Sequence, residues 1–163
     1  MDARNLGELG IELQKIITRL MANQNLLKLL YYTGKDPLSE ADLTSEQIKN
    51  EFFEKLIKVV PRVGPKETAQ SLIALQVING IPNRENNEFN IINFNVEVFV
   101  PLTQWMIKDS NLRPFAIMGE ITKTLSRKTI NGLGRIIYEG FEVNFLTDEI
   151  SCYEMTFSIE NYD

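Results

Sequence analysis

The chain has 163 residues, of which 44% are hydrophobic and 24% charged, so its composition is that of an ordinary globular domain with its own core. It contains no histidine and a single cysteine, Cys152. These absences exclude histidine-based catalysis, the usual zinc ligand sets and an intramolecular disulfide. The net charge of -5 disfavours direct DNA binding on average, although a local basic stripe remains compatible with it.

The amino-terminal part of the chain has the spacing of amphipathic helices. Apolar residues recur every three or four positions from Leu6 to Leu20, which predicts one helical face. A bend near 21–25 and a second short helix over 26–31 should follow. After a polar loop, Thr44 and Gln47 could form a capping box for a brief helix that runs to about Leu56.

Beyond Pro61 and Pro65 the apolar period changes to the alternation of strands. It predicts strands over 68–79, 93–100, 135–145 and 152–160. A helix over 114–125 should lie between the two hairpins and cover the sheet.

The expected faces of two of these elements are specific enough to check. In the strand over 135–145, we expect one side to carry Ile137, Phe141, Val143 and Phe145. In the helix we expect Phe115, Met118, Ile121, Thr122 and Leu125 to share one face, with Glu120, Lys123 and Thr124 more toward water.

We therefore predict one α+β domain over 1–163, with an antiparallel sheet of about four or more strands covered by a helix. Residues 1–60 form a mainly helical amino-terminal part, and 66–163 form the sheet-and-helix core. The amino terminus has no signal-peptide pattern, and no apolar run is long enough to cross a bilayer. We expect a protein that stays in the cytoplasm and does not engage a membrane.

No set of reactive side chains stands out. Gly132-Leu133-Gly134 lacks the context of a phosphate loop and reads as a turn. Acidic pairs such as Asp148 with Glu149 lie in polar segments and are better explained as solvated. We expect no catalytic residue, no cofactor and no metal site, so the protein should not be an enzyme.

Two groups of residues could instead contact partners. The first is a basic group around the end of the third helix, which could touch phosphate or a partner's acidic edge, or simply complement the helix dipole. Its members are Lys123, Arg127, Lys128 and Arg135. The second is Trp105 with Met106, which could anchor a subunit contact or plug the core under the helix.

The element order and two segments carry a family resemblance. Ser110-Asn111-Leu112-Arg113-Pro114 opens a helix, and Ile130-Asn131-Gly132-Leu133-Gly134 leads into the closing hairpin. With the amino-terminal helix and the first hairpin, this arrangement resembles the tail terminator proteins of tailed bacteriophages and their head-to-tail joining relatives.

The resemblance implies a virion protein of the neck that is made in the host cytoplasm. It would form a homo-oligomeric ring, usually a hexamer, that caps the tail tube and stops its polymerisation. One face would meet the tail tube protein and any sheath, and the other face the head connector or stopper protein. Genomic DNA would pass through an acidic lumen without specific binding.

The exposed hairpin loops would then be natural contacts with neighbouring rings. In the loop over 80–88 the candidates are Asn83, Arg84 and Asn86, and in the loop over 147–150 they are Asp148 and Glu149. Arg113, in the segment that carries the resemblance, is a further candidate.

Three alternatives stay open. The chain could be another ring of the neck, such as a head completion or stopper protein. It could be a cytoplasmic, non-enzymatic ligand-binding or regulatory α+β domain, which would need a deep apolar pocket. A histidine-free hydrolase would need two acids held close in a cleft, and the sequence offers no such pair.

Overall fold

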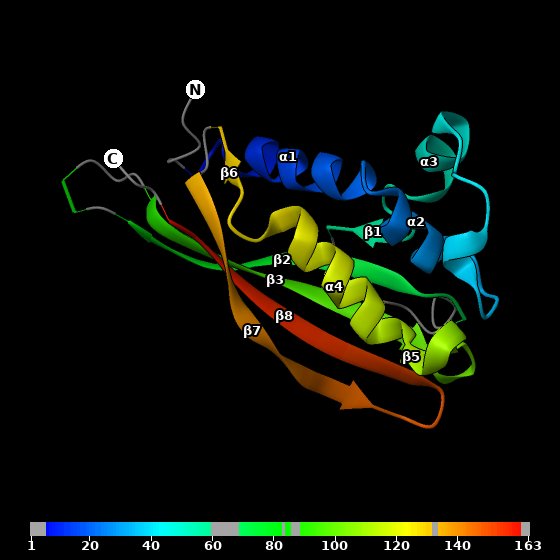
Figure 1. Ribbon diagram of the computed structural model, residues 1–163. Coiled ribbons are helices and arrows are strands. Elements are labelled where there is room, and N and C mark those ends of the chain that lie inside the picture. The colour runs from blue at the N-terminus through cyan, green and yellow to red at the C-terminus, as the bar shows by residue number, and fades with distance from the viewer. Residues whose placement is uncertain (1–5, 60–68, 83, 86–88, 132–133, 161–163) are drawn as a thin grey trace.

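The structure is a computed structural model that describes residues 6–59, 69–82, 84–85, 89–131 and 134–160. It is an α+β fold, as predicted, with helices gathered on one face of a curled six-stranded sheet (Figure 1). The strand order is β1-β2-β3-β8-β7-β6, and only β1 runs parallel to its neighbour. The sheet strands are β1 Ile57–Lys58, β2 Leu72–Pro82, β3 Phe89–Pro101, β6 Thr129–Ile130, β7 Gly134–Leu146 and β8 Ile150–Glu160.

The helices are α1 Leu9–Met21, α2 Gln24–Tyr31, α3 Ser45–Glu51 and α4 Arg113–Leu125. Short 3-10 turns cover Pro37–Ser39, Leu102–Gln104 and Lys108–Ser110. A two-residue hairpin, β4 Met106–Ile107 with β5 Asn111–Leu112, precedes α4. Within the described residues no helix is long and apolar enough to cross a membrane.

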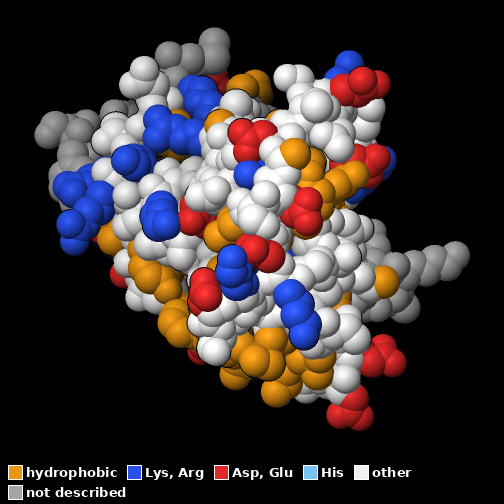
Figure 2. Space-filling model, turned by 45° about the vertical axis from the view of Figure 1, so that its right-hand side comes forward, with side chains coloured by type: hydrophobic (Ala, Val, Ile, Leu, Met, Phe, Trp, Pro, Cys, Tyr) orange, Lys and Arg blue, Asp and Glu red, His pale blue; other side chains and the backbone are white. Residues whose placement is uncertain are grey.

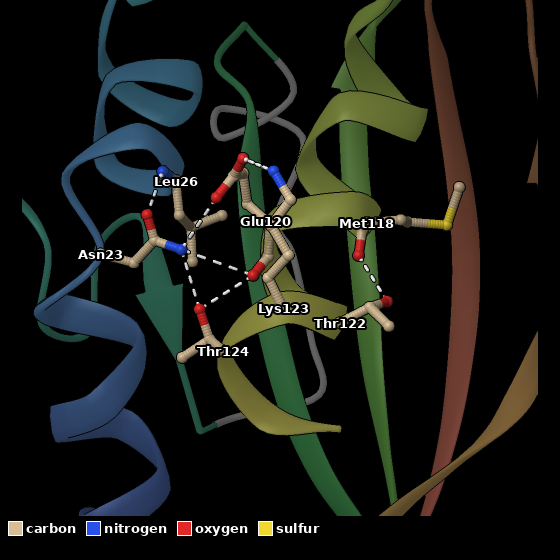
Figure 3. A network of polar contacts seen from close by, with 7 residues as sticks. All are labelled: Asn23, Leu26, Met118, Glu120, Thr122, Lys123 and Thr124. Atoms are coloured by element: carbon tan, nitrogen blue, oxygen red, sulfur yellow. Dashed lines mark hydrogen bonds and ion pairs between the residues drawn. The ribbon is translucent and has the colours of Figure 1, made fainter. Parts of the chain in front are cut away.

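The predicted bend between the first two helices is fixed by Asn23. Its Oδ1 accepts from the Leu26 backbone N–H and caps α2. Its Nδ2 lies 2.8 Å from Thr124 Oγ1 and 3.1 Å from Glu120 Oε2, so the same side chain ties α2 to α4 (Figure 3). Glu120 is therefore 9% exposed, and the expectation that it faces water is wrong.

The third helix is shorter than predicted. The capping box of Thr44 with Gln47 is present, as the sequence indicates. The helix nevertheless ends at Glu51, because the Phe52 carbonyl accepts from three later N–H groups in a turn where Glu54 has φ 59°. This turn buries Phe52 completely and feeds the chain into β1.

The first hairpin is longer than predicted, since pairing of β2 with β3 continues to Pro82 and Phe89. The loop is correspondingly shorter. In the core, Phe94 and Phe157 stack across β3 and β8 with ring centroids 5.1 Å apart. From α4, Ile117, Ile121 and Leu125 are fully buried above this sheet. Phe115 is not part of that buried face, because it is 40% exposed at the border of the helix layer.

Candidate assembly interface

Strand β7 exposes an apolar surface that includes three of the four residues expected to share one side of this strand. Phe141, Val143, Phe145 and Leu146 are 52%, 56%, 40% and 61% exposed, and we call these four residues the β7 strip. Figure 2 shows hydrophobic side chains gathered along the lower border of the molecule. Contiguous exposed apolar side chains of this kind are typical of surfaces that contact a partner.

Two irregularities explain why the predicted single face of this strand is wrong. The pairing of β7 with β8 shifts between Tyr138 and Gly140 and again between Val143 and Phe145. Gly140 has φ 141°, a conformation that glycine adopts readily. Phe141 pairs with Met155 under the helices, whereas Phe145 pairs with Cys152 on the opposite face. Strict alternation predicts neither shift.

The helix-side part of the β7 strip continues into neighbouring aromatic rings. The Phe115 ring lies 6.1 Å from the Phe141 ring and 5.4 Å from the Tyr153 ring, measured between centroids. Met106 is 64% exposed and belongs to the β4-β5 hairpin that leads into α4. This exposure is compatible with the expected role of Met106 as an anchor in a subunit contact. Trp105 is partly buried against the core, and its Nε1 donates to Ser151 Oγ at 2.8 Å. Of the two readings for Trp105, the geometry favours the core plug.

Arg113 has no surface left to offer a partner. It is completely buried, and its guanidinium donates to four backbone carbonyls, those of Leu29, Tyr32, Gly34 and Gln104. Three of these carbonyls lie in or just beyond the last turn of α2, where carbonyls lack intrahelical donors. Burial lowers the pKa of this guanidinium. Its placement among the contact candidates is a mistake that the burial explains, since Arg113 joins α2 to α4 inside the chain.

The basic residues lie at one end of the sheet. Arg127, Lys128 and Arg135 are exposed where α4 passes into β6 and β7, and the register sets Arg135 opposite Thr129. Lys15 and Arg19 of α1 reach this end, because they donate to the carbonyls of Asn131 and Thr129. Sequence spacing could not reveal these two, since they are more than 100 positions from their partners. Figure 2 shows blue side chains gathered at this end of the molecule.

Lys123 stands apart from that group. Its Nζ pairs with Glu120 Oε1 at 2.9 Å one turn away on α4, while most of its side chain stays exposed. It therefore forms a local ion pair along the helix, which neither the partner-contact reading nor the helix-dipole reading of the basic residues predicts.

The face of the sheet opposite the helices carries a row of acids. Glu97 of β3 pairs with Glu154 of β8, which in turn pairs with Glu142 of β7. Directly opposed side chains share a face, so the three carboxylates lie side by side across three strands. Burial, and secondarily the charge of Glu154, raises the pKa of Glu97. We call Glu97, Glu154 and Glu142 the acidic row.

The next row along this face is apolar. Phe99, Cys152 and Phe145 are paired across the same three strands. Cys152 is completely buried, and burial, followed by the charge of Glu97, raises the pKa of its thiol to about 12. A thiol that stays protonated is a poor nucleophile, so the burial of Cys152 favours a structural role.

The loop candidates can be placed only in part. Asn83 and Asn86 lie outside the described residues, whereas Arg84 is exposed. Asp148 and Glu149 are exposed in the turn between β7 and β8, which Thr147 organises by accepting from the N–H groups of Glu149 and Ile150. This turn adjoins the end of the β7 strip.

Within the described ranges, no group of three or more His, Cys, Asp or Glu side chains is arranged to hold a metal ion. A mainly apolar hollow lies between α1 and α3, has a volume of about 560 Å³, and is lined by Met21, Ser45, Ile48, Lys49 and Phe53. Ser45 and Lys49 are its only polar side chains.

Comparison with known proteins places the chain in a family. The family model described as YomW, a phage-associated family, matches residues 23–159, a range that begins just after α1 and reaches nearly the end of β8. No curated protein matches the sequence.

Proposed function

The chain belongs to the YomW family of phage-associated proteins, and from this premise we propose that it is a structural protein of the phage neck. In this proposal it forms a ring, usually a hexamer in proteins of the kind it resembles, that caps the tail tube, ends tube polymerisation and joins the tail to the head connector. The observation that carries the proposal is the β7 strip, four exposed apolar side chains on both faces of an edge strand.

A closed ring gives such a surface a use. In a cyclic assembly each subunit contacts the next through two different patches, so every apolar patch is covered without open-ended growth. Burying the β7 strip would remove four large apolar side chains from water, each worth about 1 kcal/mol or more at its present exposure.

Glu142 and Glu154 of the acidic row suit the channel of such a ring, whereas Glu97 is buried. A lumen lined with carboxylates repels the phosphate backbone, so DNA can pass without adhering. The helices occupy the opposite face, and the basic end with Arg127, Lys128 and Arg135 would then be offered to a neighbouring ring.

The alternatives in the neck share this reasoning. A head completion or stopper protein also forms a ring. The length of the free tails in a deletion mutant distinguishes these two positions from that of a tail terminator. A small molecule bound in the hollow beside Ile48 would meet few polar groups to orient it.

Deletion of the gene from its phage tests the proposal, with the wild-type gene supplied in trans as the control. Electron micrographs should show filled heads without tails and free tails of uncontrolled, mostly excessive length. Free tails of normal length would assign the protein to another ring of the neck. Infectious particles with normal tails, free of this protein by mass spectrometry, would refute a neck function.

A further inference from the structure

Strand β7 is an open edge of the sheet for most of its length. The short strand β6 pairs only with Gly134 and Arg135, and the Ile136 N–H and C=O are used by Lys128 and Arg127. From 137 to 146 no described strand lies on the outer side of β7, as its position at the border of the sheet in Figure 1 illustrates. An edge with unpaired N–H and C=O groups is a template for another strand.

This edge lacks the lysine, the proline and the short length that commonly protect edges from pairing, although it contains two register shifts. Residues 137–146 contain two glutamates, no lysine, no arginine and no proline. The exposed apolar side chains of the β7 strip flank the free backbone. Lysine, proline and short length are the common means of blunting an edge, so this edge is suited to a partner strand.

The opposite side of the sheet ends in a second exposed edge. β1 pairs with β2 only at Ile73 and Ala74, and none of the other described strands lies outside β2 from 75 to 82. Ile78 and Ile81 are 47% and 51% exposed there. The residues from 75 to 82 carry no charged side chain.

The two edges are compatible in direction. The pairs β2 with β3, β3 with β8 and β8 with β7 are all antiparallel, so β7 runs opposite to β2. If a second copy is placed beside the first in the same orientation, its β2 meets β7 of the first copy as an antiparallel neighbour. The joined sheet then keeps the same alternation of strand directions across the subunit boundary.

Charge distinguishes this arrangement from a two-fold pairing of β7 with itself. In a two-fold pair, Glu139 and Glu142 of both copies would gather on one seam with no cation in the stretch, and two acidic rows would meet end to end. Like charges opposed across strands are destabilising. Against β2, the acidic β7 edge meets an uncharged one.

We propose that β7 of each copy pairs antiparallel with β2 of the next copy through residues 137–146 and 75–82. Repetition of this heterologous contact closes a ring in which the sheets are continuous and the acidic rows lie on one face. The inference rests on the proposed ring, and it specifies the surfaces that build it.

Cross-linking tests the contact on the full chain. Val143→Cys and Ile78→Cys are placed together in one chain and treated with a short bismaleimide; the buried Cys152 serves as background in the unaltered chain. We expect a covalent ladder of dimers and larger species from the double variant and none from either single variant. Two Val143 positions in adjacent copies would be four strands apart, about 19 Å at about 4.8 Å per strand, beyond a short linker.

Each other result overturns the inference. A covalent dimer from Val143→Cys alone would indicate the two-fold pairing. A multimer by light scattering without any ladder would place the contact elsewhere and leave the proposed ring intact. Single chains at every concentration would refute pairing between copies, while the tail-length experiment would still decide the neck function.

Substitutions with a matched control give an independent measurement. Val143→Lys and Leu146→Lys add charges to the exposed edge and should shift the assembly to the mass of one chain, 18.7 kDa. Ile11→Lys, on an α1 residue that is 63% exposed, should leave the assembly unchanged. Equal behaviour of all three variants would count against the edge contact.

Discussion

Replacement of Arg113 by methionine should destabilise the protein strongly. The hydrogen bonds described for its guanidinium go to backbone carbonyls and not to a carboxylate. The guanidinium Nε donates to the Gln104 carbonyl at 2.8 Å, and Nη1 donates to the Leu29 carbonyl at 2.6 Å, both in fully buried surroundings. The bonds to the Tyr32 and Gly34 carbonyls, at 2.8 Å and 2.6 Å, are partly buried, so water can replace the donor there.

The magnitude follows from the two buried carbonyls that lose their donor. Each buried acceptor left unsatisfied costs about 1–3 kcal/mol, and removal of a buried cation returns part of that sum. We therefore expect a loss of about 3 kcal/mol in the free energy of unfolding. For a chain of this size the melting temperature should fall by about 6–12 °C.

Urea denaturation followed by tryptophan fluorescence measures this loss, since Trp105 is the only tryptophan. Arg113→Lys keeps the charge but not the forked donors, so it should fall between the methionine variant and the wild type. The exposed Arg127→Met is the matched control and should change stability by less than about 0.5 kcal/mol. A methionine variant at position 113 as stable as this control would refute the assignment of Arg113 as the clamp between α2 and α4.

Three further outcomes follow from single side chains. The pKa of Glu97 is raised in the native state, so the native state binds this proton more tightly than the unfolded state does. The stability that the protonated Glu97 contributes is therefore lost as pH rises from the unfolded pKa through the folded one. Glu97→Gln should be more stable than wild type at pH 7, and urea titrations should show that this gain vanishes near pH 4. Cys152, with its thiol pKa near 12 and no exposure, should resist iodoacetamide at pH 8 in the native protein and react after denaturation, as mass spectrometry would show; rapid native alkylation would contradict its burial. Asn23→Asp keeps the cap on α2 but replaces the amide donor near Glu120 by a carboxylate, so it should cost more stability at pH 7 than at pH 4 by thermal melting. Equal losses at the two pH values would show that repulsion between the two carboxylates contributes little.

The sequence predicts what local periodicity controls. Alternating residues in β3 and β8 and the helical spacing in α1 and α4 are sufficient to predict an α+β fold and the order of its elements. The capping box at Thr44 is recognisable because both of its members lie within one turn. Asn23 is recognisable as an interruption between two helices, although its bonds to α4 are not.

The features that matter for assembly depend on contacts across the chain. The burial of Arg113 needs the end of α2, about 80 positions earlier, to supply carbonyls. The β7 strip is exposed because no described element covers it and because two register shifts redirect its side chains. An apolar residue in a strand reads as core in any pattern-based prediction, so Phe141, Val143 and Phe145 could not be recognised as surface from the sequence.

The mass of the purified protein in solution tests the central claim most directly. Light scattering over a wide range of concentration, followed by electron microscopy of the largest species, should reveal closed rings whose mass is a fixed multiple of 18.7 kDa, six for a hexamer. Assembly should be lost in Val143→Lys and kept in Ile11→Lys. A mass of 18.7 kDa at every concentration, with no rings in the micrographs, would contradict the account.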